Sequence, residues 1–155
     1  VVTERGGLAT YHGPGQLVGY LLLDIASRGI KVREMVCAIE NGVIRWLKEN
    51  GVTASRRVGF PGVWVGNSKI CALGLHFRKG VSMHGFALNM TTELTGYSSI
   101  TPCGITDGGI TSYFQETGRP LIPHDVAFSV AARIIESLRL TPQAHADNGL
   151  ALEGM

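Results

Sequence analysis

Two stretches of the chain carry apolar residues at spacings of three and four, the period of an α-helix. In residues 31–50 the repeating positions are Val32, Met35, Val36, Ile39, Val43 and Leu47, and in residues 123–140 they are Val126, Val130, Ile134 and Leu138. These stripes predict two amphipathic helices. Gly51 stands where a left-handed C-terminal cap is common, and Pro123 suits a first turn. Gly42 fits less well, because glycine inside a helix costs about 1 kcal/mol relative to alanine.

The remaining apolar segments are short and predict strands. Residues 17–25 suit a buried strand, and residues 63–65, 70–77 and 81–88 have strand-like composition. Residues 78–80 between the last two suit a tight hairpin turn. The glycine-rich stretch 5–16 predicts a shaped loop, and residues 91–111 predict a long loop of the kind that often carries function. We therefore expect an α+β fold with a mostly antiparallel sheet flanked by helices.

Composition narrows the class of protein. The length of 155 residues predicts one domain that spans residues 1–155. The net charge of +2 argues against a nucleic-acid or membrane partner. Three widely spaced cysteines contain no CxxC pair, so we expect no zinc site and a reducing, cytoplasmic location. The glycine loop matches neither GxxxxGK[ST] nor GxGxxG, which disfavours a nucleotide site.

Cys103 is the sharpest candidate for chemistry, because a cysteine between Pro102 and Gly104 lies on tightly turned, accessible backbone. A reactive thiolate needs a nearby cation, and Lys69 at the start of an apolar strand is the candidate. Taken singly, an idle cysteine and a solvated lysine are the commoner situations. His12 and His84 each precede a glycine and leave a Cys–His dyad open, with loop-pinning structural histidines as the alternative. Cys37 and Cys71 fall in apolar patterns and are interpreted as core.

Three motifs together resemble the lipoyl(octanoyl) transferases, which are octanoyl-[acyl-carrier-protein]:protein N-octanoyltransferases. The motifs are RGGLATYHGPGQ at 5–16, KICALG at 69–74 with HGFALN at 84–89, and PCGI at 102–105. The resemblance covers the chain to about Leu140 and implies a fold like the catalytic core of biotin and lipoate-protein ligases. It also implies that substrate contacts come from Arg5, Gly6, Gly7, Leu8, Ala9, Thr10, Tyr11, His12, Ala72, Leu73, Gly74, Gly85, Phe86 and Ala87.

The same resemblance implies a reaction. Cys103, activated by Lys69, would take an octanoyl group from acyl carrier protein as a thioester. The group would pass to a lysine of a lipoyl domain, in a 2-oxoacid dehydrogenase complex or the glycine cleavage H protein. No cofactor and no metal are expected, because a thioester donor is already activated. Leu73, Leu75 and Phe86 are candidates to line a tunnel for the acyl chain.

The chain departs from the family at its beginning. Family members carry some tens of residues before the RGG motif, and here the motif starts at Arg5. We therefore expect an N-terminally trimmed catalytic domain. Two alternatives stay open: an inactive remnant that binds only an acyl carrier or a lipoyl domain, and an ATP-dependent lipoate or biotin ligase.

Overall fold

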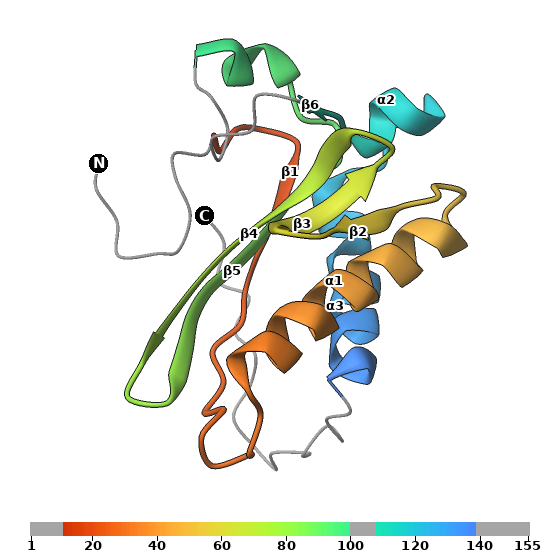
Figure 1. Ribbon diagram of the computed structural model, residues 1–155. Coiled ribbons are helices and arrows are strands. Elements are labelled where there is room, and N and C mark those ends of the chain that lie inside the picture. Colours follow the sequence, from red (N-terminus) through yellow and green to blue (C-terminus); the bar gives the residue numbers. More distant parts are fainter. Residues whose placement is uncertain (1–10, 100–107, 139–155) are drawn as a thin grey trace.

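The computed structural model describes residues 11–99 and 108–138 and shows one twisted sheet with two helices packed on one side (Figure 1). The strands are β1 (Gln16–Tyr20), β2 (Ser55–Arg57), β3 (Phe60–Val65), β4 (Ser68–Arg78), β5 (Val81–Asn89) and β6 (Gly109–Ile110). The helices are α1 (Val32–Glu49), α2 (Tyr113–Thr117) and α3 (Pro123–Ser137), with a 3₁₀ helix, η1, at Leu94–Ser99.

The sheet is antiparallel apart from one short parallel pair. Its order is β1-β5-β4-β3-β2, and β6 pairs in parallel with the beginning of β4. The long β4–β5 hairpin extends away from the rest of the sheet (Figure 1). Its turn has φ values of 51° at Lys79 and 82° at Gly80, both in the left-handed region that tight two-residue hairpins use. The predicted α+β arrangement and the hairpin are confirmed.

Helices α1 and α3 pack against each other closely at Gly42. A Cβ atom built on Gly42 would lie 2.6 Å from the Cα atom of Ile134 in α3. The Trp46 indole N–H donates to the Ser129 hydroxyl across the same interface at 2.8 Å. The glycine that weakened the helix pattern therefore lies where the two helices come closest.

The ends of α1 follow the sequence prediction to within one residue. Gly51 has φ 89° directly after the C-cap residue Asn50, as a left-handed cap requires. In α3, Val126, Val130 and Ile134 are buried as predicted, and the helix ends at Ser137, just before Leu138.

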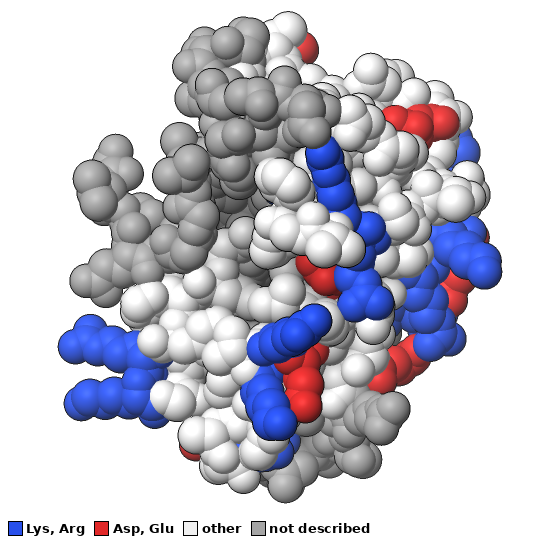
Figure 2. Space-filling view, viewed as in Figure 1, with Lys and Arg blue, Asp and Glu red and all other residues white. Residues whose placement is uncertain are grey.

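Opposite charges bridge α1 and α3 on their solvent side. Arg133 in α3 donates to Glu49 at 2.8 Å and to Glu136 at 2.9 Å, and Arg45 in α1 reaches both carboxylates. Figure 2 shows basic and acidic side chains next to one another on this side of the molecule. The Arg133 hydrogen bond lowers the pKa of Glu49. Because these pairs are exposed, each stabilises the fold only weakly.

Three sequence predictions were wrong in part. Strand β1 ends at Tyr20, and it is an edge strand with alternating exposure, because Val18 and Tyr20 point to solvent. Residues 21–29 continue irregularly, with one bridge from Asp24 to Val81. Cys37 is only half-buried, since it lies beside the buried stripe of α1. The predicted loop 91–111 contains η1 and β6.

Among residues 11–99 and 108–138, none of the helices combines the length and the apolar character that crossing a bilayer would demand.

Candidate functional site

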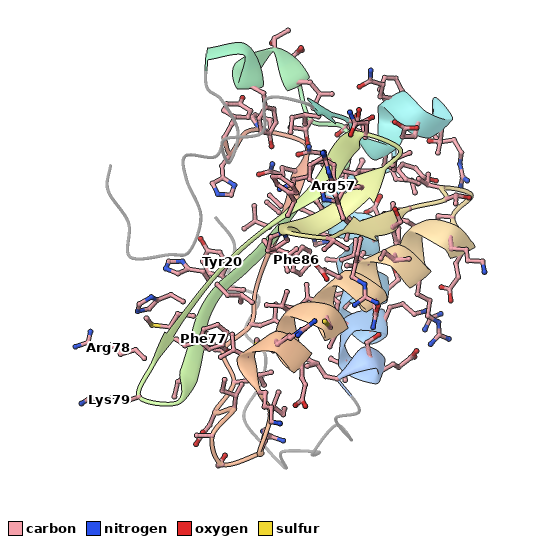
Figure 3. All side chains as sticks on the ribbon, in the orientation of Figure 1. Tyr20, Arg57, Phe77, Arg78, Lys79 and Phe86 are labelled. Carbon is pink, nitrogen blue, oxygen red and sulfur yellow. The ribbon has the colours of Figure 1, made fainter. Side chains whose placement is uncertain are left out.

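The two faces of the sheet differ in what covers them. Directly opposite residues in paired strands share a face, so the pairs Cys71–Leu88 and Leu73–Phe86 point the same way. These side chains belong to or pack against the core beneath the helices. Figure 3 shows Phe77 and Phe86 on this helix side and Tyr20 on the opposite side. The opposite side is called the open face below.

Small residues form the centre of the open face. Ala72 pairs with Ala87, and Gly74 pairs with Gly85, so four small residues lie together on β4 and β5. Gly85 also lies close to β1, because a Cβ there would overlap the carbonyl oxygen of Gly19. Ala72 and Gly74 are half-buried, and Gly85 and Ala87 are buried. Their small size means that whatever packs on this face comes close to the backbone of β4 and β5.

The substrate-contact residues expected from the resemblance separate into two groups. Ala72, Gly74, Gly85 and Ala87 lie on the open face. Leu73, Leu75 and Phe86 lie on the core side of the sheet. Leu73 and Phe86 can therefore offer only backbone groups to a ligand on the open face.

A β-bulge decides where Lys69 points. Val63 pairs with Cys71 but the next residue, Trp64, pairs with Lys69, so Ile70 is an extra residue on β4. Ile70 and Cys71 are both fully buried in the core. Lys69 consequently shares the open face with Ala72, although strict alternation would place residues three apart on opposite faces.

Lys69 is buried, with 5% of its surface exposed, so it is not a solvated lysine at a strand end. Its Nζ atom donates to the Pro61 carbonyl oxygen at 3.1 Å. The same atom lies 4.9 Å from the centre of the Trp64 ring. A carbonyl oxygen and the face of an indole both attract a cation, so these contacts favour the ammonium form.

A second cation shares the Trp64 indole. The Arg57 guanidinium lies 5.0 Å from the centre of the Trp64 ring and 4.7 Å from that of Phe60. Its Nη1 donates to the Asn67 side-chain oxygen at 3.2 Å. Arg57 and Lys69 therefore concentrate positive charge beside one aromatic side chain at this end of the sheet.

A buried amide links the glycine-rich loop to the rest of the site. The Asn89 side chain accepts from Gln16 Nε2 at 2.8 Å and from the Tyr97 hydroxyl at 3.3 Å, and donates to the Thr111 carbonyl at 3.0 Å. The Tyr11 ring packs edge-on against Tyr97 at 5.2 Å. Sequence reasoning gave Gln16, Asn89 and Tyr97 no role, although Gln16 and Asn89 end two of the quoted motifs.

The two histidine candidates have structural contacts. Nδ1 of His12 lies 2.7 Å from the Gln16 side-chain oxygen, and His12 itself is exposed. His84 has φ 63°, and its ring packs edge-on against Tyr20 at 5.9 Å. Both contacts are with neighbouring side chains and fit histidines with a structural role.

Several predicted site residues lie outside the described residues, namely Cys103 and the loop residues Arg5, Gly6, Gly7, Leu8, Ala9 and Thr10. The first strand that the structure describes after Cys103, β6, lies beside Lys69. Gly109 and Ile110 pair with Ser68 and Lys69, and the Thr111 amide donates to the Lys69 carbonyl at 3.0 Å.

Cys71 is close to Lys69 but unsuited to nucleophilic chemistry. It is fully buried, and burial raises the pKa of its thiol far above the ordinary value of 9.0, against the opposing pull of Lys69. Its interpretation as core is confirmed. Across the part of the chain that the structure describes, no three His, Cys, Asp or Glu side chains come together as a metal site.

The sequence is similar to bacterial proteins named octanoyltransferase and to one family model. The family model described as "Lipoyl protein ligase A/B catalytic domain" matches residues 1–135. The octanoyltransferase of Dechloromonas aromatica is 46% identical over 89% of this chain and 67% of its own length. The octanoyltransferase of Aromatoleum aromaticum is 49% identical over 94% of this chain and 61% of its own length. The octanoyltransferase of Desulforamulus reducens is also 49% identical, over 76% of this chain and 52% of its own length. The chain thus spans about half to two thirds of these relatives.

Solved structures share the fold at lower identity. The biotin protein ligase of Aquifex aeolicus superposes with a TM-score of 0.64 at 20% identity, over 81% of this chain and 53% of its own. A lipoate-protein ligase A bound with ATP superposes with a TM-score of 0.65 at 20% identity, over 87% of this chain and 57% of its own. The expected likeness to the biotin and lipoate-protein ligase core is confirmed. The family model matched over residues 1–135 and the relative that is 46% identical over 67% of its own length show that the chain belongs to the lipoyl protein ligase A/B catalytic domain family.

Proposed function

We propose that this chain transfers an octanoyl group from acyl carrier protein to a lysine of a lipoyl domain, through a thioester on Cys103, in protein lipoylation. The observation that carries the proposal is the buried Lys69 ammonium on the open face, held by the Pro61 carbonyl and the Trp64 ring. Relatives named octanoyltransferase at 46–49% identity agree with this reaction.

The pairing of Lys69 with Cys103 is supported by the length of the connection. Gly109, which pairs with Ser68 beside Lys69, lies six positions after Cys103 in the chain. Six residues span at most about 20 Å. This tether is short enough for the Cys103 thiol to reach the Lys69 ammonium, and an ammonium beside a thiol favours the thiolate.

The reaction has two steps with one covalent intermediate. In the first step the Cys103 thiolate attacks the octanoyl thioester carbonyl, a new C–S bond forms, and the C–S bond to the carrier breaks. The carrier leaves as a thiolate that takes up a proton from the Lys69 ammonium. In the second step the ε-amine of the acceptor lysine attacks, a C–N bond forms, and the C–S bond to Cys103 breaks. Lys69 accepts the amine proton in this second step, after acylation has removed the thiolate charge that had held its own proton.

The open face suits the acyl group. Ala72, Gly74, Gly85 and Ala87 leave room for an extended chain against the backbone of β4 and β5. The loop residues from Arg5 to His12 complete the contacts in this proposal. Each methylene removed from water contributes about 0.8 kcal/mol, so the depth of this surface sets the chain-length preference.

The partners in this proposal are two proteins and the compartment is the cytoplasm. The donor is octanoyl-acyl carrier protein, and the acceptor is a lipoyl domain of a 2-oxoacid dehydrogenase complex or the glycine cleavage H protein. No nucleotide is required, because the thioester already carries an activated acyl group.

Intact mass spectrometry tests the proposal directly. Incubation with octanoyl-acyl carrier protein should add one octanoyl group to the chain, and peptide mapping should place the group on Cys103. Cys103→Ser should abolish the adduct that hydroxylamine removes, while Cys37→Ser, a change at a half-buried cysteine of α1, should leave it unchanged. A chain that binds the carrier without forming any adduct would instead be a binding module.

An ATP-dependent ligase is the second candidate, because the structural neighbours include ligases described as bound to ATP. Iodoacetamide separates the two functions. A ligase retains its activity after Cys103 is alkylated, whereas the acyltransferase proposed here loses it.

A further inference from the structure

Glu40 is a buried carboxylate in the middle of α1, with 5% of its surface exposed. Its Oε1 atom accepts a hydrogen bond from the backbone N–H of Gly62 in β3 at 2.9 Å. A buried carboxylate is costly unless it is hydrogen-bonded, so this contact constrains where the Gly62 peptide lies.

The other end of the same peptide group holds Lys69. The carbonyl bonded to the Gly62 nitrogen belongs to Pro61, and it accepts from Lys69 Nζ at 3.1 Å. The N–H and C=O of a trans peptide point in opposite directions within one plane. One peptide group therefore lies between a carboxylate and an ammonium, with its positive end toward Glu40 and its negative end toward Lys69 (the Pro61–Gly62 bridge).

Glycine is required for this arrangement. Gly62 has φ 131°, a conformation that side chains disfavour. A Cβ at this position would also lie 2.6 Å from the Cys71 carbonyl oxygen and 3.2 Å from Lys69 Cε. The bridge can therefore approach Lys69 closely only with glycine at position 62.

We propose that Glu40 is a positioning residue for the Lys69 ammonium and acts through the Pro61–Gly62 bridge. The carboxylate orients the peptide and polarises it, so that the Pro61 carbonyl binds the ammonium more strongly. The importance of this contact for catalysis rests on the acyl transfer proposed above.

Other ionisable groups face Lys69 from the elements around it. Cys71 in β4 stays a neutral thiol because burial raises its pKa. Arg57 in β2 is always cationic and lies on the same Trp64 indole, so it opposes the ammonium. Among the described groups, Glu40 is the carboxylate that is linked to Lys69 through the Pro61–Gly62 bridge.

An NMR titration of the lysine side chains tests the proposal. The chain has four lysines, so a ¹³C-lysine sample gives four Cε–Hε signals, and Lys69→Arg identifies the one from Lys69. The variant Glu40→Gln retains an oxygen acceptor for the Gly62 N–H but removes the charge. Its Lys69 signal should titrate at lower pH than in the wild type, because loss of a nearby anion disfavours the ammonium.

The matched control is Glu49→Gln, the same change on the same helix. Glu49 binds Arg45 and Arg133 on the solvent side, so this variant should leave the Lys69 midpoint unchanged. An unchanged midpoint in Glu40→Gln as well would overturn the proposal.

A wild-type measurement covers the case in which Glu40→Gln does not fold. The carbonyl carbon of Pro61 should shift in step with the Lys69 titration, because it accepts from that ammonium. A flat Pro61 signal through the transition would refute the bridge.

The titrations need no acyl donor, so their outcome is independent of the octanoyl adduct. If octanoyl adds to Cys103 but Glu40→Gln leaves the Lys69 midpoint unchanged, only the positioning role of Glu40 is refuted. If Glu40→Gln shifts the Lys69 midpoint but no octanoyl adduct forms on Cys103, the bridge stands and the proposed acyl transfer is refuted. As an activity readout, Glu40→Gln should slow formation of the octanoyl adduct on Cys103 about tenfold, because less Lys69 ammonium is present to hold the thiolate, while KM for the lipoyl domain stays the same.

Discussion

Replacing Gly42 with alanine sets two physical effects against each other. Helix propensity alone favours the change, because alanine in a helix interior is about 1 kcal/mol better than glycine. The packing of α1 on α3 opposes it, because the new Cβ would lie 2.6–2.7 Å from the Cα, nitrogen and Cγ1 atoms of Ile134. Two of these three atoms are backbone and cannot rotate away.

The packing term is the larger one. Carbon atoms prefer separations of about 3.5–4.0 Å, so α3 must move by about 1 Å or distort at this point. Overpacking of a closely packed interior costs about 1–3 kcal/mol, and a backbone contact belongs at the upper end of that range. After the gain in propensity is subtracted, Gly42→Ala should destabilise the chain by about 1–2 kcal/mol.

Urea unfolding followed by circular dichroism measures this difference. Gly42→Ala should lower the midpoint at unchanged slope, and the melting temperature should fall by about 2–4 °C per kcal/mol. Asn41→Ala, at the exposed neighbouring position, should be neutral or slightly stabilising. Adding Ile134→Ala should not rescue Gly42→Ala, because the backbone contacts remain. A Gly42→Ala chain more stable than the wild type would show that the helix approach does not limit this position.

Three further predictions follow from the site. Gly85→Ala should weaken the pairing of β1 with β5, because its Cβ would overlap the Gly19 carbonyl; its unfolding free energy should fall by about 1–3 kcal/mol in urea, and an unchanged value would refute the close approach. Lys69→Arg should still form the Cys103 adduct, because arginine is a cation, but it should fail to pass the octanoyl group to the acceptor lysine in single-turnover assays; equal transfer rates for the two chains would refute the proton-accepting role. Burial raises the pKa of Cys71 above the ordinary 9.0, so the unfolded state releases this proton first and the unfolding free energy should fall as pH rises above about 9. The slope of the unfolding free energy against pH should be smaller in Cys71→Ala, and an identical slope would contradict this linkage.

Local patterns predicted α1, α3 and the hairpin well, but not the short helices α2 and η1. The α1 stripe and its Gly51 cap depend on residues within one or two turns of each other, so the sequence contains the whole signal. Strand-like composition likewise located β4 and β5, and residues 78–80 indicated the turn between them. Gly42 was noted as an anomaly, but its reason lies in α3, some ninety residues away along the chain.

The candidate site depends on contacts that local patterns do not encode. The hydrogen bond between Gln16 and Asn89 joins residues 73 positions apart. Glu40 occupies a buried position on α1, and only the placement of β3 shows that it binds Gly62. The orientation of Leu73 and Phe86 depended on the register of the sheet, which composition alone leaves open.

The extra residue at Ile70 also limits how the length of this protein can vary in evolution. One more inserted residue between Lys69 and Ala72 would rotate the ammonium toward the helices, because side chains alternate along a strand. Insertions at the hairpin tip around Lys79 carry no such penalty, since the strands can lengthen in pairs there. Homologous chains should therefore differ freely in size at the tip, and the spacing from the lysine to the alanine should stay fixed at three.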